Sequence, residues 1–141
     1  MASYNKFNKF VQDLCKGEHD FDADAFKILL TLTAPIAANA IKSDLTEISA
    51  GDGYTAGGNS TTMSTSLSTG TAKVTGTDPT TWTAATGSFA NFRYAVLYND
   101  TATTLTDPLI GWWDYGATVD LNAAETFTVD LDASAGVFTL V

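Results

Sequence analysis

The chain has one cysteine and one histidine, and their spacing raises the possibility of a nucleophilic site. Cys15 and His19 are four residues apart, which makes two side chains neighbours on a helix. A histidine beside a cysteine can activate the thiol, but Gly17 lies between them and predicts a helix end. Zinc needs three or four such ligands, and two are present. We therefore expect Cys15 to be a small buried residue, and we expect no catalytic residue, metal ion or cofactor.

An acidic loop in the same region copies part of a calcium-binding motif. Asp20, Asp22 and Asp24 occupy the first three ligand positions of such a loop. Ala25 then stands where the turn glycine is needed, and Thr31 stands where the bidentate glutamate is needed. The pattern favours a solvated acidic loop over a calcium site.

Two further carboxylates lie close to aromatic residues, as in the floor of a glycosidase. These are Asp114 and Asp120, beside Trp112 and Tyr115 in the sequence. Acidic side chains on the outer faces of strands explain them better. Arg93 lies within an apolar run, where an unpaired charge is costly. We predict a structural ion pair between Arg93 and Asp114.

The tryptophans are the remaining candidates for binding. Trp112 and Trp113 are adjacent, so they must point to opposite faces of a strand. We expect Trp112 to join Tyr94 and Tyr98 in the core. Trp113 then lies on a second face, covered by the helix, a loop or a partner. A core or interface role is favoured over the stacking of sugars.

These side chains belong to residues 92–116, two apolar runs joined by a polar link. The first run alternates in steps of two, the period of a strand. Pro108 precedes the second run, and proline is tolerated at the start of a strand. The two runs predict an antiparallel pair closed by the loop 99–107.

The N-terminal segment predicts the only helix, Ser3–Lys16. Ser3 is a candidate N-cap and Gly17 a candidate C-terminal cap. A helix this short is marginal alone and must pack against another part of a protein. That part is either its own sheet or, as the more specific hypothesis, a neighbouring subunit. We divide the chain into an amphipathic arm (1–17) and a β-sandwich domain (18–141). The residues predicted to face the partner are Phe7, Phe10, Val11 and Leu14, together with Trp113.

Most of the other segments predict short strands separated by turns. Residues 25–33 form a first strand, and residues 125–132 and 137–141 form a terminal hairpin. In the threonine-rich region 60–86, Met63, Leu67, Val74 and Trp82 are expected to face inward. The glycines of the loop 49–59 mark positive φ or close backbone approach. The pattern predicts a mainly β protein, an antiparallel, jelly-roll-like β-sandwich with one N-terminal α-helix.

Length, net charge and the distribution of apolar residues limit the classes of partner that we expect. The 141 residues fit one domain, and the formal net charge is −9. Such a polyanion is repelled by phosphate, so nucleic acid is not an expected partner. No apolar run reaches membrane-spanning length, and MASYNKFNKF lacks the apolar stretch of a secretory signal. We expect the chain to fold in a cytoplasm and to bind no membrane.

Several stretches resemble a family of small structural proteins of tailed bacteriophages. They are SYNKFNKFVQDL, LTEISAGDGYTAGGN, FRYAVLYNDTATTLTDPLIGWWDYG and ETFTVDLD. The resemblance implies a virion component with no enzymatic activity, made in the host cytoplasm and most favourably a capsid decoration or cement protein. Its expected partners are the major capsid protein and copies of itself, with a trimer possible. A tail or fibre component and a carbohydrate-binding module for host attachment remain alternatives.

Overall fold

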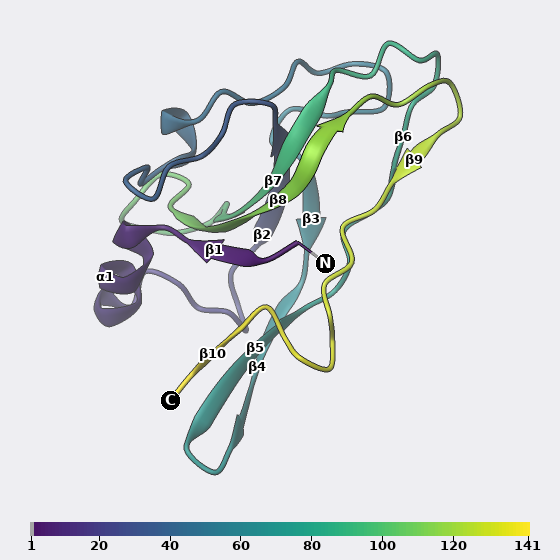
Figure 1. Cartoon of the computed structure of the whole chain (residues 1–141). Coiled ribbons are helices and arrows are strands. Elements are labelled where there is room, and N and C mark those ends of the chain that lie inside the picture. The colour runs from purple at the N-terminus through teal and green to yellow at the C-terminus, as the bar shows by residue number, and fades with distance from the viewer. Residues whose placement is uncertain (1) are drawn as a thin grey trace.

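The computed structural model describes residues 2–141 and shows a mainly β chain with antiparallel sheets and one α-helix, as predicted. The sheets form an open sandwich that does not close on itself (Figure 1). The elements, in chain order, are β1 (Tyr4–Lys6), α1 (Asn8–Lys16), β2 (Phe26–Thr31), the 3-10 helix η1 (Lys42–Asp44), β3 (Asn59–Thr61), β4 (Met63–Ser68), β5 (Thr71–Gly76), β6 (Trp82–Thr83), β7 (Phe92–Asn99), β8 (Leu109–Val119), β9 (Thr126–Phe127) and β10 (Phe138–Leu140).

The central sheet has the strand order β1-β8-β7-β2-β3. Its middle is the predicted hairpin of β7 and β8, which pair antiparallel, and Pro108 directly precedes β8. Strand β7 is apolar on both faces because the core covers both of them, and Val96, Leu97 and Tyr98 are fully buried. Tyr98 also donates a hydrogen bond of 2.8 Å to the carbonyl of Gly57. The prediction of Tyr98 as a core residue is confirmed.

The N-terminal segment is part of the fold and not a separate arm. Residues 4–6 form strand β1, which pairs with β8, so the helix begins at Asn8 and Ser3 does not cap it. Phe7 is the N-cap residue and is completely buried. The predicted C-terminal cap is confirmed, because Gly17 has the left-handed φ of 71° that lets its N–H reach back to the last turn. Among residues 2–141, no helix is long and apolar enough to cross a bilayer.

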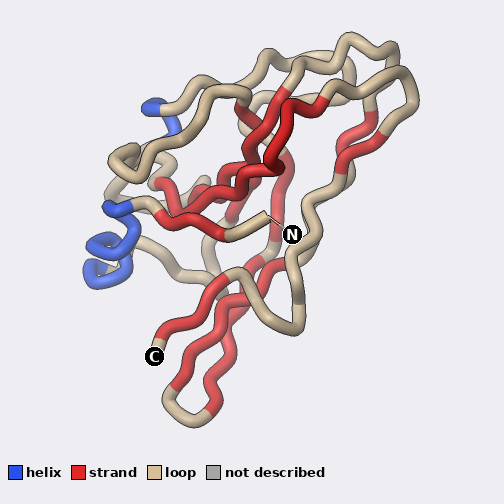
Figure 2. Tube along the Cα trace, viewed as in Figure 1, coloured by secondary structure: helices blue, strands red, loops and turns tan. Residues whose placement is uncertain are grey.

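The second sheet, β10-β5-β4, projects away from the central sheet as a long hairpin with β10 on one side (Figures 1 and 2). Thr69 and Gly70 both have positive φ in the two-residue turn, which matches the twist of a hairpin. Met63 and Val74 are buried at its base, as predicted. Leu67, expected to face inward, is 76% exposed because β4 runs past the edge of the core.

The predicted terminal hairpin is wrong. Strand β9 is only two residues long and pairs with β6, while β10 pairs with β5. The alternating residues after β9 still face inward, and Leu131 is 6% exposed. Its N–H donates to Asp78 at 2.7 Å instead of to a strand partner. Residues 128–132 therefore have no strand partner, and a turn at residues 133–135 leads from them to β10.

The glycine-rich loop 49–59 holds two close backbone approaches, as predicted. A Cβ on Gly58 would lie 1.9 Å from the carbonyl oxygen of Ile28, and one on Gly53 would lie 2.0 Å from that of Thr83. Tyr54 in the same loop is buried, accepts a hydrogen bond from the N–H of Leu30 and donates one of 2.6 Å to Glu47. Burial raises the pKa of Tyr54 far above its ordinary value.

Candidate functional site

An open groove lies between the central sheet and the extended segment that follows β9. We call it the Trp113 groove, and its volume is about 550 Å³. In Figure 1 the segment between β9 and β10 passes beside the start of β1. One wall comes from β1, β7 and β8, including Tyr4, Trp113 and Tyr115, and the other comes from residues 127–132 and 135–137.

The register of the central sheet determines which face each of the two adjacent tryptophans occupies. Trp113 pairs with Tyr4 on one side and Ala95 on the other, so these three side chains share the face that lines the groove. The Tyr4 and Trp113 rings meet edge to face with centroids 5.6 Å apart. Trp112 lies on the opposite face, where its ring is 4.5 Å from that of Phe7. The expectation that the two tryptophans face opposite sides is confirmed; Trp112 is partly buried against the core, and Trp113 is partly buried in the groove.

A bulge in β8 brings a further aromatic ring to the rim. Tyr94 pairs with Asp114 but Phe92 pairs with Val119, so β8 has extra residues between these two contacts. Extra residues on one strand bend it locally and redirect its side chains. Tyr115, inside the bulge, is 62% exposed, and its ring centroid is 5.9 Å from that of Phe127. The rim is therefore aromatic on both sides.

The predicted ion pair lies beside this bulge. Arg93 donates two hydrogen bonds to Asp114, from Nε at 2.7 Å and from an Nη at 2.9 Å. The guanidinium and a hydrogen bond from the N–H of Gly116 hold the pKa of Asp114 below its ordinary value. Arg93 also packs 5.4 Å from the centroid of the Tyr94 ring, and Tyr94 is partly buried. The Arg93–Asp114 prediction is confirmed, and the pair leaves little net charge at this end of the groove.

The helix residues predicted to bind a partner lie mainly within the protein's own core. Phe7 is completely buried and Phe10 is 3% exposed, with the Phe10 ring 5.4 Å from that of Phe138. Leu14 packs partly against the core, and Val11 is 44% exposed. The sequence periodicity identified the buried stripe correctly, but its partners belong to the same chain, with Phe7 against Trp112 of the central sheet and Phe10 against Phe138 of the second sheet. The predicted partner contact is therefore wrong at Phe7 and Phe10, and it stays a prediction at Val11 and Leu14.

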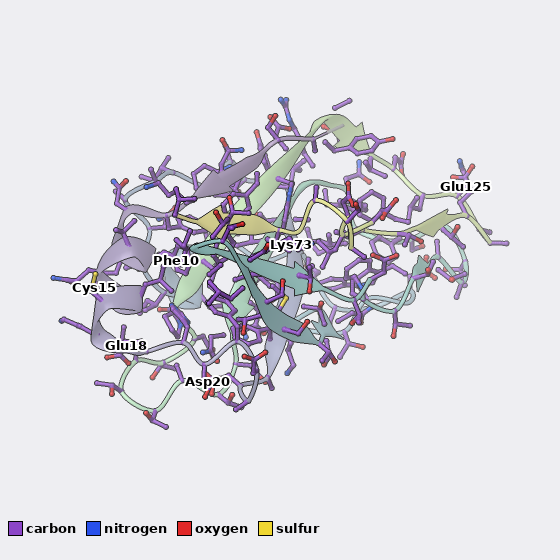
Figure 3. The ribbon with its side chains drawn as sticks, turned by 90° about the horizontal axis from the view of Figure 1, so that it is seen from below. Phe10, Cys15, Glu18, Asp20, Lys73 and Glu125 are labelled. Atoms are coloured by element: carbon purple, nitrogen blue, oxygen red, sulfur yellow. The ribbon has the colours of Figure 1, made fainter. Side chains whose placement is uncertain are left out.

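Cys15 and His19 are not brought together as a reactive pair. Cys15 is exposed on the outer side of α1, which corrects the expectation of a buried cysteine, whereas Phe10 points from α1 towards the sheets (Figure 3). His19 is buried, and its Nδ1 lies 3.2 Å from Nδ2 of Asn99. Asn99 also donates to Asp24 at 2.7 Å. Sequence reasoning missed Asn99, because a terminal strand residue carries no local sign of this network.

The buried His19 makes stability depend on pH. Burial lowers its pKa from the ordinary 6.5, against the opposing pull of Asp13, Asp24 and Glu18, while Lys9 lowers it further. The unfolded chain then takes up a proton near pH 6.5 before the folded chain does, so the stability contributed by neutral His19 is lost as pH falls below 6.5.

We expect the free energy of unfolding to fall between pH 7.5 and pH 5.5 by at most about 1.4 kcal/mol per pH unit from this one residue. The measurement is urea unfolding at several pH values. In His19→Asn, which keeps an acceptor for Asn99, the slope should flatten. An unchanged slope in this variant would contradict the assignment.

The acidic loop uses its carboxylates to organise the chain. Asp22 accepts hydrogen bonds from the backbone N–H of Thr65, at 2.7 Å, and from its hydroxyl. Asp24 accepts from the N–H of Asp20 and from Asn99. These bonds tie the loop to β4 and β7. Within residues 2–141, no group of three histidine, cysteine or acidic side chains is arranged to hold a metal ion.

Comparison with known protein families, with curated proteins and with solved structures finds no match to this chain. The resemblance to bacteriophage structural proteins therefore stays a prediction. The geometry provides a groove with aromatic walls and carboxylates at its rim, which is suited to non-covalent binding by stacking, apolar contact and charge.

Proposed function

We propose that this chain is a non-enzymatic structural protein of a bacteriophage particle, a decoration or cement protein that bridges major capsid protein subunits and contacts copies of itself, with a trimer possible. The observation that supports a binding role is the Trp113 groove. Trp113 and Phe127 are only partly covered, and Tyr115 is 62% exposed. Partly covered aromatic residues in a concave site are typical anchors of protein interfaces.

The mechanism is adhesion. Each copy would bury surface against neighbouring capsid subunits, and that surface has to be exposed again before the shell ruptures. A standard interface buries roughly 800 Å² per partner, and repetition over a symmetric shell converts moderate contacts into avidity. The net charge of −9 favours a basic surface on the partner. The groove replaces α1 as the proposed contact, because Phe7 and Phe10 are occupied within the chain.

A carbohydrate-binding module is the second candidate. The observation that favours it is the same set of rings, since Trp113 and Tyr115 are accessible for stacking on sugars. A glycan array separates the two candidates: glycan binding that is lost on Trp113→Ala would support the module for host attachment.

The location can be tested on purified virions of the phage that encodes the chain, labelled with gold-conjugated antibody against it. We expect label over the whole head, because a decoration protein occupies every repeat of the shell. Pre-adsorbing the antibody with purified protein serves as the control. Label confined to the tail would favour the tail or fibre alternative, and unlabelled particles would contradict a virion role.

A further inference from the structure

The second wall of the Trp113 groove is a continuous stretch of main chain. All six residues from Phe127 to Asp132 line the groove, although side chains of an extended chain alternate between two faces. The backbone of this stretch must therefore form part of the wall. Its residues after Phe127 belong to no strand, although they come directly after β9.

Peptide groups of this stretch are left without partners. Within residues 2–141, the N–H groups of Thr128, Val129 and Asp130 donate no hydrogen bond, and the next N–H, of Leu131, is satisfied by the Asp78 side chain. Exposed, extended backbone with unpaired groups is the feature to which a further strand adds. The open side of the sandwich thus offers both an apolar floor and a hydrogen-bonding edge.

The charge of the groove favours a cation. Asp130 and Asp132 line it and are exposed, while the one basic side chain that lines it among residues 2–141, Arg93, is already held by two hydrogen bonds to Asp114. Lys73 lies near Asp132 outside the lining, and its ammonium group donates to the carbonyl of Ser134. One carboxylate oxygen of Asp132 accepts from the N–H groups of Ser134 and Ala135. The groove therefore presents net negative charge next to aromatic rings, a combination that favours lysine or arginine.

We propose that the Trp113 groove receives an extended peptide segment of a partner protein, which adds as a strand beside residues 128–132 and places a lysine or arginine next to Asp130 and Asp132. Apolar side chains of the segment pack on Trp113 and Tyr115, and its basic side chain reaches the acidic rim. The volume of about 550 Å³ lies within the range of protein ligand sites. Naming a capsid protein as the source of the segment rests on the proposed function, whereas the chemistry of the groove is independent of it.

The test is selection of ligands by the purified full chain from a ribosome-displayed library of random nonapeptides. Nine extended residues span about 30 Å, which exceeds the length of the 128–132 stretch. We expect enriched peptides to carry lysine or arginine between apolar or β-branched residues. Affinities of the enriched peptides are then measured by fluorescence polarisation.

Matched variants show whether the groove is the binding site. Tyr115→Ala should weaken binding roughly tenfold, as for an aromatic anchor, whereas Leu67→Ala, at a residue that is 76% exposed on the far hairpin, should leave it unchanged. Asp130→Asn should weaken binding roughly two- to fivefold, as for an exposed ion pair. The control with the same change of charge is Asp120→Asn, outside the groove.

Three results would overturn the inference: no enrichment, enrichment of acidic or uncharged peptides, or basic peptides whose affinity is the same in Tyr115→Ala and Leu67→Ala. Glycan binding without peptide enrichment would assign the groove to sugars instead. No virion is used, so a failure here is distinct from a failure of the antibody labelling, which tests the proposed function alone.

Discussion

Phe7→Ala is expected to lower the free energy of unfolding by about 3–5 kcal/mol, a range typical of truncating a buried phenylalanine. Phe7 is completely buried at the junction of β1 and α1, its ring contacts Trp112, and its N–H bonds to the carbonyl of Ile110. A domain of this size is stable by about 5–15 kcal/mol, so the variant should lose a substantial share of its stability. Urea unfolding followed by tryptophan fluorescence measures the change.

Val11→Ala on the same helix is the control. Val11 is 44% exposed, so its truncation should change the free energy of unfolding by no more than about 0.5 kcal/mol. Equal effects at positions 7 and 11 would mean that the helix does not dock through Phe7. The N-terminal segment would then be an arm, as the sequence alone predicted.

Gly58→Ala is expected to cost at least about 3 kcal/mol, because two penalties act together. Gly58 has a φ of +75°, a conformation that strains any residue with a Cβ. The added methyl would also lie 1.9 Å from the carbonyl oxygen of Ile28 and 2.7 Å from the Cα of Leu29, and backbone cannot move aside as a side chain can. The loop would have to separate from β2. Thermal unfolding by circular dichroism reports the loss as a lower midpoint.

Gly70→Ala separates the two penalties. Gly70 has a similar φ of +82°, but a methyl group added at this position in the hairpin turn would have no other atom within 4 Å. Only the backbone strain applies there, about 1–2 kcal/mol. If both variants lost the same stability, the close approach of the glycine-rich loop to β2 would be disproved.

The features predicted correctly from the sequence are those with a local cause. The alternation of residues 92–98 and the position of Pro108 indicated the β7–β8 hairpin. Arg93 was paired with Asp114 because a charge inside an apolar run needs a partner, and the register of β7 and β8 places the two close together. The amphipathic stripe likewise identified Phe7 and Phe10 as residues that must be covered.

The predictions that were wrong concern contacts between distant parts of the chain. Strand β1 has three residues, too few to show a period, and it forms because β8 offers an edge. Residues 125–132 alternate like a strand, yet alternation does not say which strand lies alongside. In the structure β9 pairs with β6 and β10 pairs with β5, whereas the hairpin would have paired these two C-terminal segments with each other. Long-range pairing of this kind has no local sequence signal.

The groove was predicted only in part for the same reason. Trp113 was expected to lie on a second face covered by the helix, a loop or a partner, and the adjacency of two tryptophans was sufficient for that inference. Tyr4 and Phe127 come from opposite ends of the chain, and only the fold brings them to Trp113. The one local sign was Gly116, which marks the bulge that turns Tyr115 outward.

The most direct test of an adhesion role is the occupancy of two exposed-residue variants on virions that lack the chain. Each purified variant, Tyr115→Ala in the groove and Val11→Ser on the helix, is titrated onto these particles, and the bound copies are quantified by gel densitometry against the wild type. We expect Tyr115→Ala to lower occupancy at a given concentration and Val11→Ser to match the wild type. Loss of occupancy in Val11→Ser with full occupancy in Tyr115→Ala would contradict the account.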